Sequence, residues 1–333
     1  MKSDILPITA VVATRNRPHA LRSTLASLEK QSAQPSEIIV VDASTTSETA
    51  DVCATAAATL FGSLRHVVAA GPGAAPHRNQ GVALAQHDYI LFHDDDIDFR
   101  PECIARLWGA LQADPERGGV NAMIENQRYH PPGFWSRCLF RFLHGRHELS
   151  YAGLMIGPAF NLLPEDREDA PAVQPVEWLN TTCTLYRRAA LPTPPFPPLF
   201  QGASIFEDAA LSLVVARNWK LANARTARIF HDHLGGDHKR DAAALAEMTL
   251  VNREYVMAEL LGRRSPSMYA KLAVAQLFTA AANLRTLWGW RQFPAVLRGQ
   301  ARGWWKVWRK RRGDVARQNR KLSFAERPVE TGS

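Results

Sequence analysis

The first hundred residues alternate between short apolar runs and segments with helical spacing, and this alternation restricts the possible folds more than any other feature of the chain. The apolar runs are ITAVVA (8–13), EIIVV (37–41), LRHVVA (64–69) and YILF (89–92). Helices are expected at 18–31, where Pro18 opens the first turn, and at 46–61 and 75–86. Nearly continuous apolar runs are typical of strands covered on both faces. The pattern predicts βαβ units and a mostly parallel sheet, which is an α/β fold.

The chain after residue 100 is less regular. We expect a helix over 103–113 behind Pro101, a strand leading into a helix within 175–191, a helix over 205–218, a short strand within 222–233, and helices from about 242 to 312. Residues 128–175 are rich in proline, arginine and aromatics, and we interpret them as irregular or inserted. The segment 192–200 holds five prolines in nine residues, which excludes both regular structures and predicts a loop.

Composition excludes several classes of protein. The four cysteines are scattered without a CxxC pair, which argues against a zinc site or a disulfide framework and fits a reducing compartment. The N-terminal residues do not have the pattern of a secretory signal. No stretch has the roughly 20 apolar residues that a membrane span needs. The net charge of +8 comes from residues 298–321, which contain ten Lys and Arg against one acid, so the rest of the chain is nearly neutral.

Three adjacent carboxylates, Asp94 to Asp96, directly follow the fourth apolar run. One explanation is a solvated acidic loop before the next helix, for which Asp98 is well placed as the N-cap. The other is a divalent cation, Mg²⁺ or Mn²⁺, held by these oxygens and bridging phosphate groups. A run of aspartates does not by itself decide between the two.

Polar residues also end the other expected strands. The first expected strand is followed by TRNRP, which contains Thr14, Arg15 and Asn16. The second strand ends in VVDAS, which contains Asp42, and the third strand is followed by HRNQG, which contains Arg78. The carboxyl ends of parallel strands meet at one edge of a sheet, where ligands bind. A carboxylate there can hydrogen-bond a base or ribose, and an arginine can bind a phosphate. Each segment alone is better explained by ordinary α/β loop chemistry.

Taken in order, TRNRP, VVDAS, HRNQG, HDDDID and FEDAAL make the chain resemble family 2 glycosyltransferases of the GT-A fold, over about residues 7–235. The resemblance implies a Rossmann-like, mostly parallel sheet flanked by helices, here with a helical, basic C-terminal extension. It also implies a catalytic domain over 1–240, with a nucleotide-sugar half (about 1–100) and an acceptor half (about 101–240). Residues 241–333 would be a Trp- and Arg-rich helical region with a disordered end.

The resemblance assigns roles to individual residues. The nucleotide pocket would be lined by Thr14, Arg15, Asn16 and Asp42, with Arg78 nearby. The metal would be bound by Asp94 and Asp96, and Asp95 would touch the ribose. The general base would be Asp208, beside a substrate-binding Glu207. His231 or His233 would add a metal ligand, and Trp178 would stack on a sugar. For these last residues the alternatives stay open. The acids of FEDAAL also suit a helix N-terminus, the histidines suit a surface loop, and the tryptophan suits a core.

The C-terminal region combines five tryptophans with clustered Arg and Lys between residues 285 and 321. Tryptophan favours the membrane–water interface, and basic side chains are attracted to anionic head groups. We therefore expect an interfacial helix that lies on an anionic membrane surface. A helix packed on the catalytic domain with a solvated basic face is the main alternative, and nucleic acid is the least favoured partner.

Together these features predict an inverting, metal-dependent glycosyltransferase that moves a sugar from a nucleotide-sugar donor to a hydroxyl of a lipid-linked or polysaccharide acceptor. We expect it to be cytoplasmic, on the inner face of the cell membrane, and to act in polysaccharide biosynthesis for the cell envelope. One rival is a sugar nucleotidyltransferase, but such enzymes usually carry a glycine-rich loop after the first strand, and TRNRP has no glycine. The other rival is a non-catalytic nucleotide-sugar-binding or scaffold protein.

Overall fold

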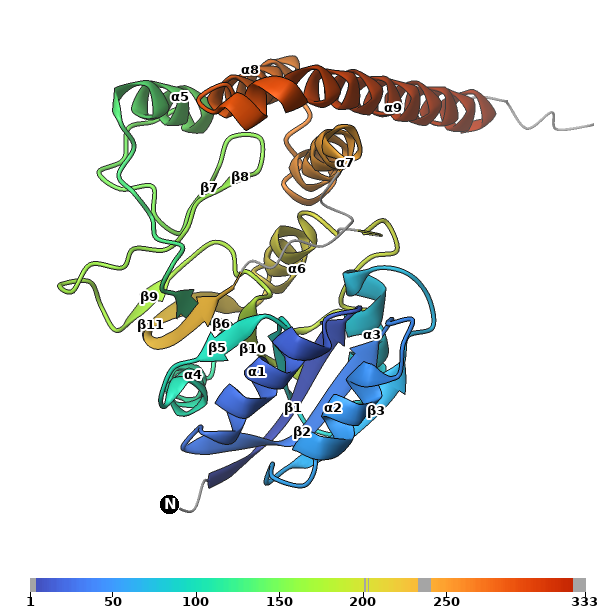
Figure 1. Cartoon of the computed structure of the whole chain (residues 1–333). Helices are drawn as coiled ribbons and strands as arrows, with labels where there is room; N and C mark the ends of the chain where they lie inside the picture. Colours follow the sequence, from blue (N-terminus) through green and yellow to red (C-terminus); the bar gives the residue numbers. More distant parts are fainter. Residues whose placement is uncertain (1–3, 201, 203, 233–240, 326–333) are drawn as a thin grey trace, which may run out of the picture.

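The computed structural model describes residues 4–200, 202, 204–232 and 241–325. An α/β body lies below a layer of helices formed by α5, α8 and α9, and α7 lies between this layer and α6 (Figure 1). The helices are α1 (Pro18–Glu29), α2 (Glu48–Ala56), α3 (Ala74–Leu84), α4 (Cys103–Gln112), α5 (Phe134–His144), α6 (Glu207–Val215), α7 (Ala242–Tyr255), α8 (Pro266–Asn283) and α9 (Leu287–Ala325). A 3-10 turn at Arg188–Ala190 and a π-helical segment at Val256–Leu260 complete the helical structure of the described residues.

The main sheet has nine strands, of which β9 pairs with β11 and the others follow the order β3-β2-β1-β4-β10-β6-β11-β5. Their bounds are β1 (Asp4–Thr14), β2 (Ala33–Asp42), β3 (Ser63–Val68), β4 (Tyr89–His93), β5 (Ile97–Phe99), β6 (Arg117–Ile124), β9 (Val173–Pro175), β10 (Cys183–Arg187) and β11 (Lys220–His231). A separate two-stranded hairpin is formed by β7 (Met155–Ile156) and β8 (Phe160–Asn161).

Strand direction and register bring the ends of the first four strands together. β1 is parallel to β2 and β4, β2 is parallel to β3, and β6 is parallel to β11, whereas β10 is antiparallel to both of its neighbours. Thr14 stands opposite Asp42, and Val12 stands opposite His93. The predicted α/β fold with a mostly parallel sheet is therefore confirmed, and the polar residues that follow these strands share one edge.

Two apolar cores cover the two faces of the sheet. On one face, Leu21, Leu25 and Leu28 of α1 are buried with residues of α2 and α4, as the helical spacing of the leucines predicts. On the other face α3, α6 and α7 contribute to the second core. A Cβ atom at Gly81 in α3 would lie 2.3 Å from Cγ1 of Val11, so a glycine is needed where this helix crosses β1.

Several expectations about local structure were wrong. Residues 128–175 contain α5, because Leu139, Phe140 and Leu143 bury one side of that helix against Tyr151 and neighbouring residues. Flanking prolines and interleaved arginines hide this apolar stripe in the sequence. The strands β5 and β6 were also missed, and the strand within 175–191 is limited to β10, followed by a 3-10 turn.

The prediction that Asp98 caps the next helix was also wrong. Asp98 lies within β5 and binds Arg100 at 2.6 Å. α4 begins later, at Cys103, and its N-cap residue Glu102 makes no side-chain capping bond. Pairing of β5 with β11 draws Asp98 into a strand, so the acid cannot reach the helix start.

The C-terminal helices share the second core with the sheet. Leu250 of α7 and Leu272 of α8 are fully buried in it, and Val307 of α9 is also buried.

The predicted domain boundary at 240/241 adjoins residues 233–240, and the predicted disordered end includes 326–333; both segments lie outside the described residues, so the division stays a prediction. The helical pattern extends past the expected end near 312, to Ala325. None of the described helices combines the length and the apolar character that crossing a membrane requires.

Candidate active site at the carboxyl edge of the sheet

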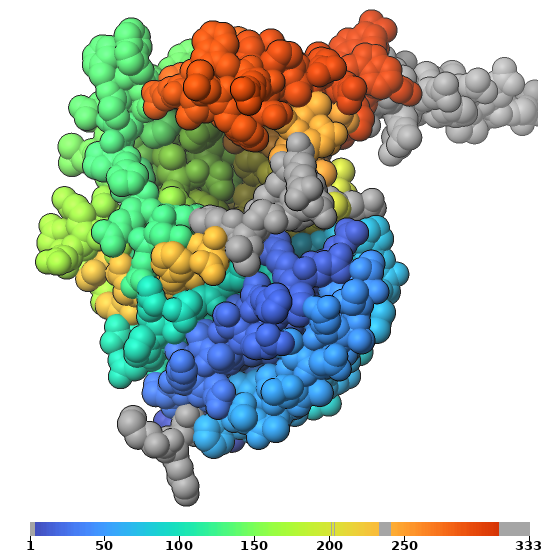
Figure 2. All heavy atoms as spheres, viewed as in Figure 1, coloured from blue at the N-terminus to red at the C-terminus, as the bar shows by residue number. Residues whose placement is uncertain are grey.

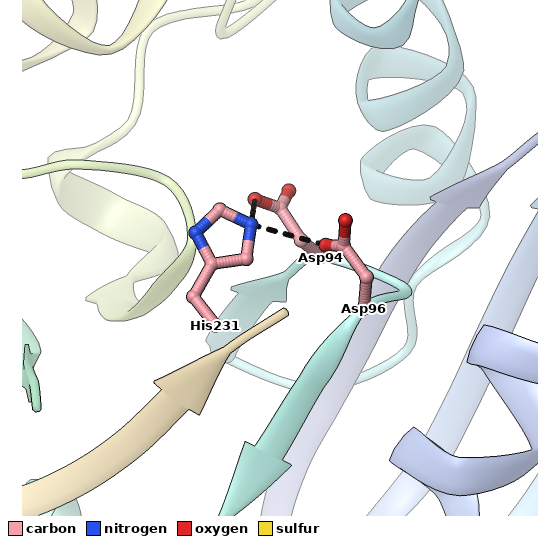
Figure 3. A group of neighbouring side chains, drawn as sticks. All are labelled: Asp94, Asp96 and His231. Atoms are coloured by element: carbon pink, nitrogen blue, oxygen red, sulfur yellow. Dashed lines mark hydrogen bonds and ion pairs between the residues drawn. The ribbon is translucent and has the colours of Figure 1, made fainter. Parts of the chain in front are cut away.

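Two carboxylates and an imidazole converge beyond the end of β4. Asp94 and Asp96 lie in the turn between β4 and β5, and His231 ends β11. Nε2 of His231 lies 3.1 Å from Oδ1 of Asp96 and 3.9 Å from Oδ2 of Asp94 (Figure 3). One ligand atom from each of the three residues lies within 4.8 Å of the others. Sequence positions 94, 96 and 231 thus form one cluster, as predicted for a metal site.

The position of His231 depends on strand pairing and on two amide side chains. β11 pairs antiparallel with β5 so that His231 stands opposite Ile97. The side chain of Asn126 donates to the carbonyl of His231 at 2.7 Å and accepts from its backbone N–H at 3.1 Å. Gln127 lies 3.1 Å from Nδ1 of the ring. The imidazole is therefore held from both the backbone and the ring edge.

Arg17 joins two of the acids, and sequence reasoning missed it. Its Nη1 donates to Oδ1 of Asp95 at 3.0 Å and to Oδ2 of Asp96 at 2.9 Å. The signal that could have identified it is its place directly before Pro18, which opens α1 at this edge of the sheet. Arg15, which was predicted instead, is exposed.

Asp95 points into the protein. Thr14 donates to its Oδ2 at 2.6 Å, and Arg17 binds the other oxygen. Burial raises the pKa of Asp95 to about 6, although Arg17 and Thr14 oppose the increase. Thr24 fixes the turn by donating to the carbonyls of Asp95 and Ile97. These contacts hold Asp95 in place as a support for the two outer acids.

Arg78 of α3 connects this cluster to α6. Its buried guanidinium donates to Asp94 at 2.7 Å and to Glu207, the first residue of α6. Burial lowers the pKa of Arg78, but Glu207 and Asp94 outweigh that effect and the net pKa is raised. Burial raises the pKa of Glu207 to about 7, against the attraction of Arg78.

Asp208 lies beside Glu207 and is not part of an ion pair with a described residue. Its Oδ1 accepts the backbone N–H of Ala209 at 2.7 Å. Burial raises the pKa of Asp208 to about 6, and the Ala209 bond and Arg78 partly oppose this. The segment before α6 has left-handed backbone at Ser204 (φ 51°) and Phe206 (φ 70°). Such strained conformations of non-glycine residues occur preferentially at functional sites.

The remaining predicted residues have varied positions. Asp42, the last residue of β2, binds His66 of β3 at 2.9 Å. Asn16 accepts the backbone N–H of Thr45 at 2.9 Å and so connects the segments that follow β1 and β2. Trp178 is 8% exposed and its indole N–H donates to the carbonyl of Leu162 at 2.7 Å, which favours the core interpretation. His233 lies outside the described residues.

The donor atoms of the cluster fit a divalent cation. Arg78 binds Oδ1 of Asp94 and Arg17 binds Oδ2 of Asp96, while the other oxygen of each acid faces Nε2 of His231. Carboxylate oxygens with one imidazole nitrogen suit Mn²⁺ or Mg²⁺. A cation would also relieve the repulsion between the two outer acids.

Residues 9–153 match the sequence profile of the family described as Glycosyl transferase family 2. A comparison with curated proteins gives no match.

Two solved structures share the fold at 15% sequence identity. The mannosyltransferase PcManGT from Pyrobaculum calidifontis, in complex with GDP-Man and Mn²⁺, aligns with a TM-score of 0.52 over 92% of this chain and 91% of its own. GalNAc-T7 with UDP, GalNAc and Mn²⁺ aligns with a TM-score of 0.53 over 78% of this chain, and the match spans about half of GalNAc-T7, 48%.

Proposed function

This chain belongs to glycosyltransferase family 2 through residues 9–153 and has the GT-A fold, and we propose that it moves a sugar from a nucleotide-sugar donor to a hydroxyl group with inversion at the anomeric carbon. The observation that carries the proposal is the convergence of Asp94, Asp96 and His231 with the Arg78–Glu207 link at one sheet edge. The two structures with the same fold contain a nucleotide or nucleotide sugar and Mn²⁺. We propose the same ligand classes here.

The donor diphosphate would lie over the cluster. Asp94, Asp96 and His231 would hold Mn²⁺ or Mg²⁺, and the cation, when bound, neutralises charge on the leaving nucleoside diphosphate. Thr14, Arg15, Asn16 and Asp42, at the ends of β1 and β2, would line the nucleoside side of the pocket.

Asp208 would be the general base. Its pKa of about 6 leaves the carboxylate ionised at pH 7 but still able to accept a proton. Asp208 takes the proton of the acceptor hydroxyl, the hydroxyl oxygen bonds to the anomeric carbon, and the bond from that carbon to the diphosphate oxygen breaks. Arg78 orients the adjacent Glu207 and so fixes the first turn of α6 against the metal-ligand acids.

We further propose that the helical layer docks on an anionic membrane, with a lipid-linked or polysaccharide acceptor of the cell envelope and with the enzyme on the cytoplasmic face. Large apolar side chains are exposed on α5 (Phe134 and Trp135, 71% and 75%) and on α9, where the exposed tryptophans are Trp288, Trp290, Trp305 and Trp308. Guanidinium groups lie over two of these rings, Arg309 at 4.5 Å from Trp305 and Arg312 at 3.9 Å from Trp308. Exposed indoles beside basic groups suit an anionic lipid interface.

A panel of nucleotide sugars, each with Mn²⁺ or with EDTA, tests the donor proposal by thermal shift. We expect one donor class to raise the melting temperature only with Mn²⁺, and Asp96→Ala and His231→Ala to abolish that rise. The matched control His147→Ala, at an exposed histidine, should respond like the wild type. A rise of equal size in EDTA, or in both site variants, would contradict the metal–donor site.

A further inference from the structure

Arg253 of α7 is a buried arginine without a polar partner among the described residues. It is 8% exposed, and both Nε and Nη1 are buried without a hydrogen bond. The central carbon of its guanidinium lies over two aromatic rings, 4.8 Å from the centroid of Phe206 and 5.1 Å from the centroid of Phe160. Burial lowers its pKa to about 10, and no carboxylate contributes an opposing effect.

The residues on either side of Arg253 do have polar partners. Asn252 donates to the carbonyl of Ile205 at 2.8 Å. Glu254 accepts from the hydroxyl of Tyr269 at 2.7 Å and lies 3.6 Å from Nζ of Lys310. The absence of a partner is thus specific to Arg253. Stacking on aromatic rings recovers less free energy than burying an unpaired guanidinium costs, so the arginine is expected to serve an anionic ligand.

The place of Arg253 in the fold indicates which ligand this is. Phe206, against which the guanidinium stacks, directly precedes Glu207 and Asp208 at the start of α6. α7 lies between α6 and the layer of α8 and α9 (Figure 1), and the surface is hollowed on one side between that layer and the body (Figure 2). Arg78 binds Glu207 and Asp94, whereas the aromatic neighbours of Arg253 are Phe206 and Phe160, which are not part of that carboxylate cluster. An anion at Arg253 would therefore approach from the helical layer and not from the nucleotide pocket.

We propose that Arg253 binds a phosphate group of a lipid-linked acceptor and so positions the acceptor hydroxyl near Asp208. This inference rests on the proposed transferase function and adds the chemical class of the acceptor. The guanidinium presents paired N–H groups that match phosphate oxygens. The rings of Phe160 and Phe206 hold the guanidinium plane before the ligand arrives, which reduces the entropy lost on binding.

Anion binding is tested directly with inorganic pyrophosphate in EDTA, a condition that removes the metal from the donor site. We expect pyrophosphate to raise the melting temperature of the wild type and of Arg264→Met, a control at an exposed arginine nearby, but not of Arg253→Met. Arg253→Lys keeps the charge and should retain a weaker response. Without ligand, Arg253→Met should melt at or above the wild-type temperature, because it replaces an unpaired charge with an apolar chain of similar length. An unchanged pyrophosphate response in Arg253→Met would overturn the proposal.

A kinetic experiment separates a lipid phosphate from free phosphate and tests the role in acceptor binding. Hydrolysis of the nucleotide sugar, with water as the acceptor, is followed in detergent with farnesyl phosphate, inorganic phosphate or farnesol as inhibitor. We expect farnesyl phosphate to inhibit the wild type best and to lose at least tenfold in potency on Arg253→Met, whereas the control Arg264→Met should be inhibited like the wild type. Equal inhibition of both proteins would refute the acceptor role. A wild type that hydrolyses no nucleotide sugar would instead contradict the transferase proposal, and the pyrophosphate result would still decide whether Arg253 binds an anion.

Discussion

Arg78 donates a 2.7 Å hydrogen bond to Asp94, and this contact joins the proposed metal-ligand cluster to the helix that begins with Glu207 and Asp208. The two ends of this link come from positions 94 and 207, which are far apart in the chain. Because the guanidinium is buried, breaking its contact with either acid would leave a buried charge unpaired, which costs a large amount of free energy. The link therefore sets the spacing between the proposed metal site and the proposed base.

Arg78→Gln should destabilise the protein, because it leaves the buried Glu207 and the partly buried Asp94 without a counter-ion. We expect the free energy of unfolding to fall by about 3 kcal/mol, measured by urea denaturation with circular dichroism. The control Arg167→Gln removes an exposed partner of Asp169 and should change it by less than about 0.5 kcal/mol. If both substitutions had equally small effects, the contacts of Arg78 with Asp94 and Glu207 would not stabilise the folded protein.

Asp208→Asn should abolish base catalysis and leave donor binding intact. The amide keeps the size of the side chain but cannot take a proton, so kcat should fall by about 10³. Nucleoside diphosphate affinity, measured by calorimetry with Mn²⁺, should stay within about twofold. The control Asp169→Asn, at an exposed acid, should behave as the wild type. Transfer that persists in Asp208→Asn would remove Asp208 from the base role.

The pH dependence of transfer follows from the raised pKa of Asp208, which is about 6. A general base works only when it is deprotonated, so kcat should be constant above pH 7 and should fall about tenfold per unit below pH 6. Stopped assays between pH 5 and 8 measure this. The residual rate of Asp208→Asn should lack this step, and a step of the same size in that variant would assign the titration to another group.

Arg17→Gln should strengthen the response to metal. Arg17 supplies positive charge to Asp95 and Asp96, so its loss leaves the acids more strongly repelled when no cation is bound. We expect a lower melting temperature in EDTA and a larger rise on adding Mn²⁺ than in the wild type. Arg15→Gln, at the exposed arginine of the same motif, should match the wild type in both conditions. The same behaviour in both variants would contradict the distinct role assigned to Arg17.

Membrane docking should depend on the exposed aromatic residues of α5 as well as those of α9. Trp135→Ser and Trp305→Ser should each weaken sedimentation with anionic phospholipid vesicles by about tenfold, since each removes a large apolar side chain from the interface. Binding should decrease as salt is raised and should be weak with neutral lipid. Phe61→Ser, at a half-exposed aromatic between α2 and β3, is the control. Unchanged sedimentation of both tryptophan variants would exclude docking through this face.

The sequence alone predicts the strand–helix order of the first hundred residues, because buried parallel strands and amphipathic helices produce local patterns. The same reasoning locates Thr14, Asp42, Arg78 and Asp94 at one sheet edge. These inferences need only the spacing of apolar residues and the rule that parallel strands end at a common edge. The choice of Asp94, Asp96 and His231 or His233 as metal-ligand candidates depends instead on the resemblance to family 2 glycosyltransferases.

Only the tertiary structure decided which neighbours these residues have. Arg17 binds Asp95 and Asp96, whereas Arg15 of the same motif is exposed. The backbone direction at the start of α1 determines which of the two arginines contacts the acids. Asp98 caps no helix because β5 pairs with β11. Nothing in the sequence of α7 distinguishes Arg253 from other arginines. Only the structure shows that its guanidinium lies over the rings of Phe160 and Phe206 and that its Nε and Nη1 make no hydrogen bond. Local pattern determines the elements, whereas contacts between distant segments determine the burial and charge environment of each site residue.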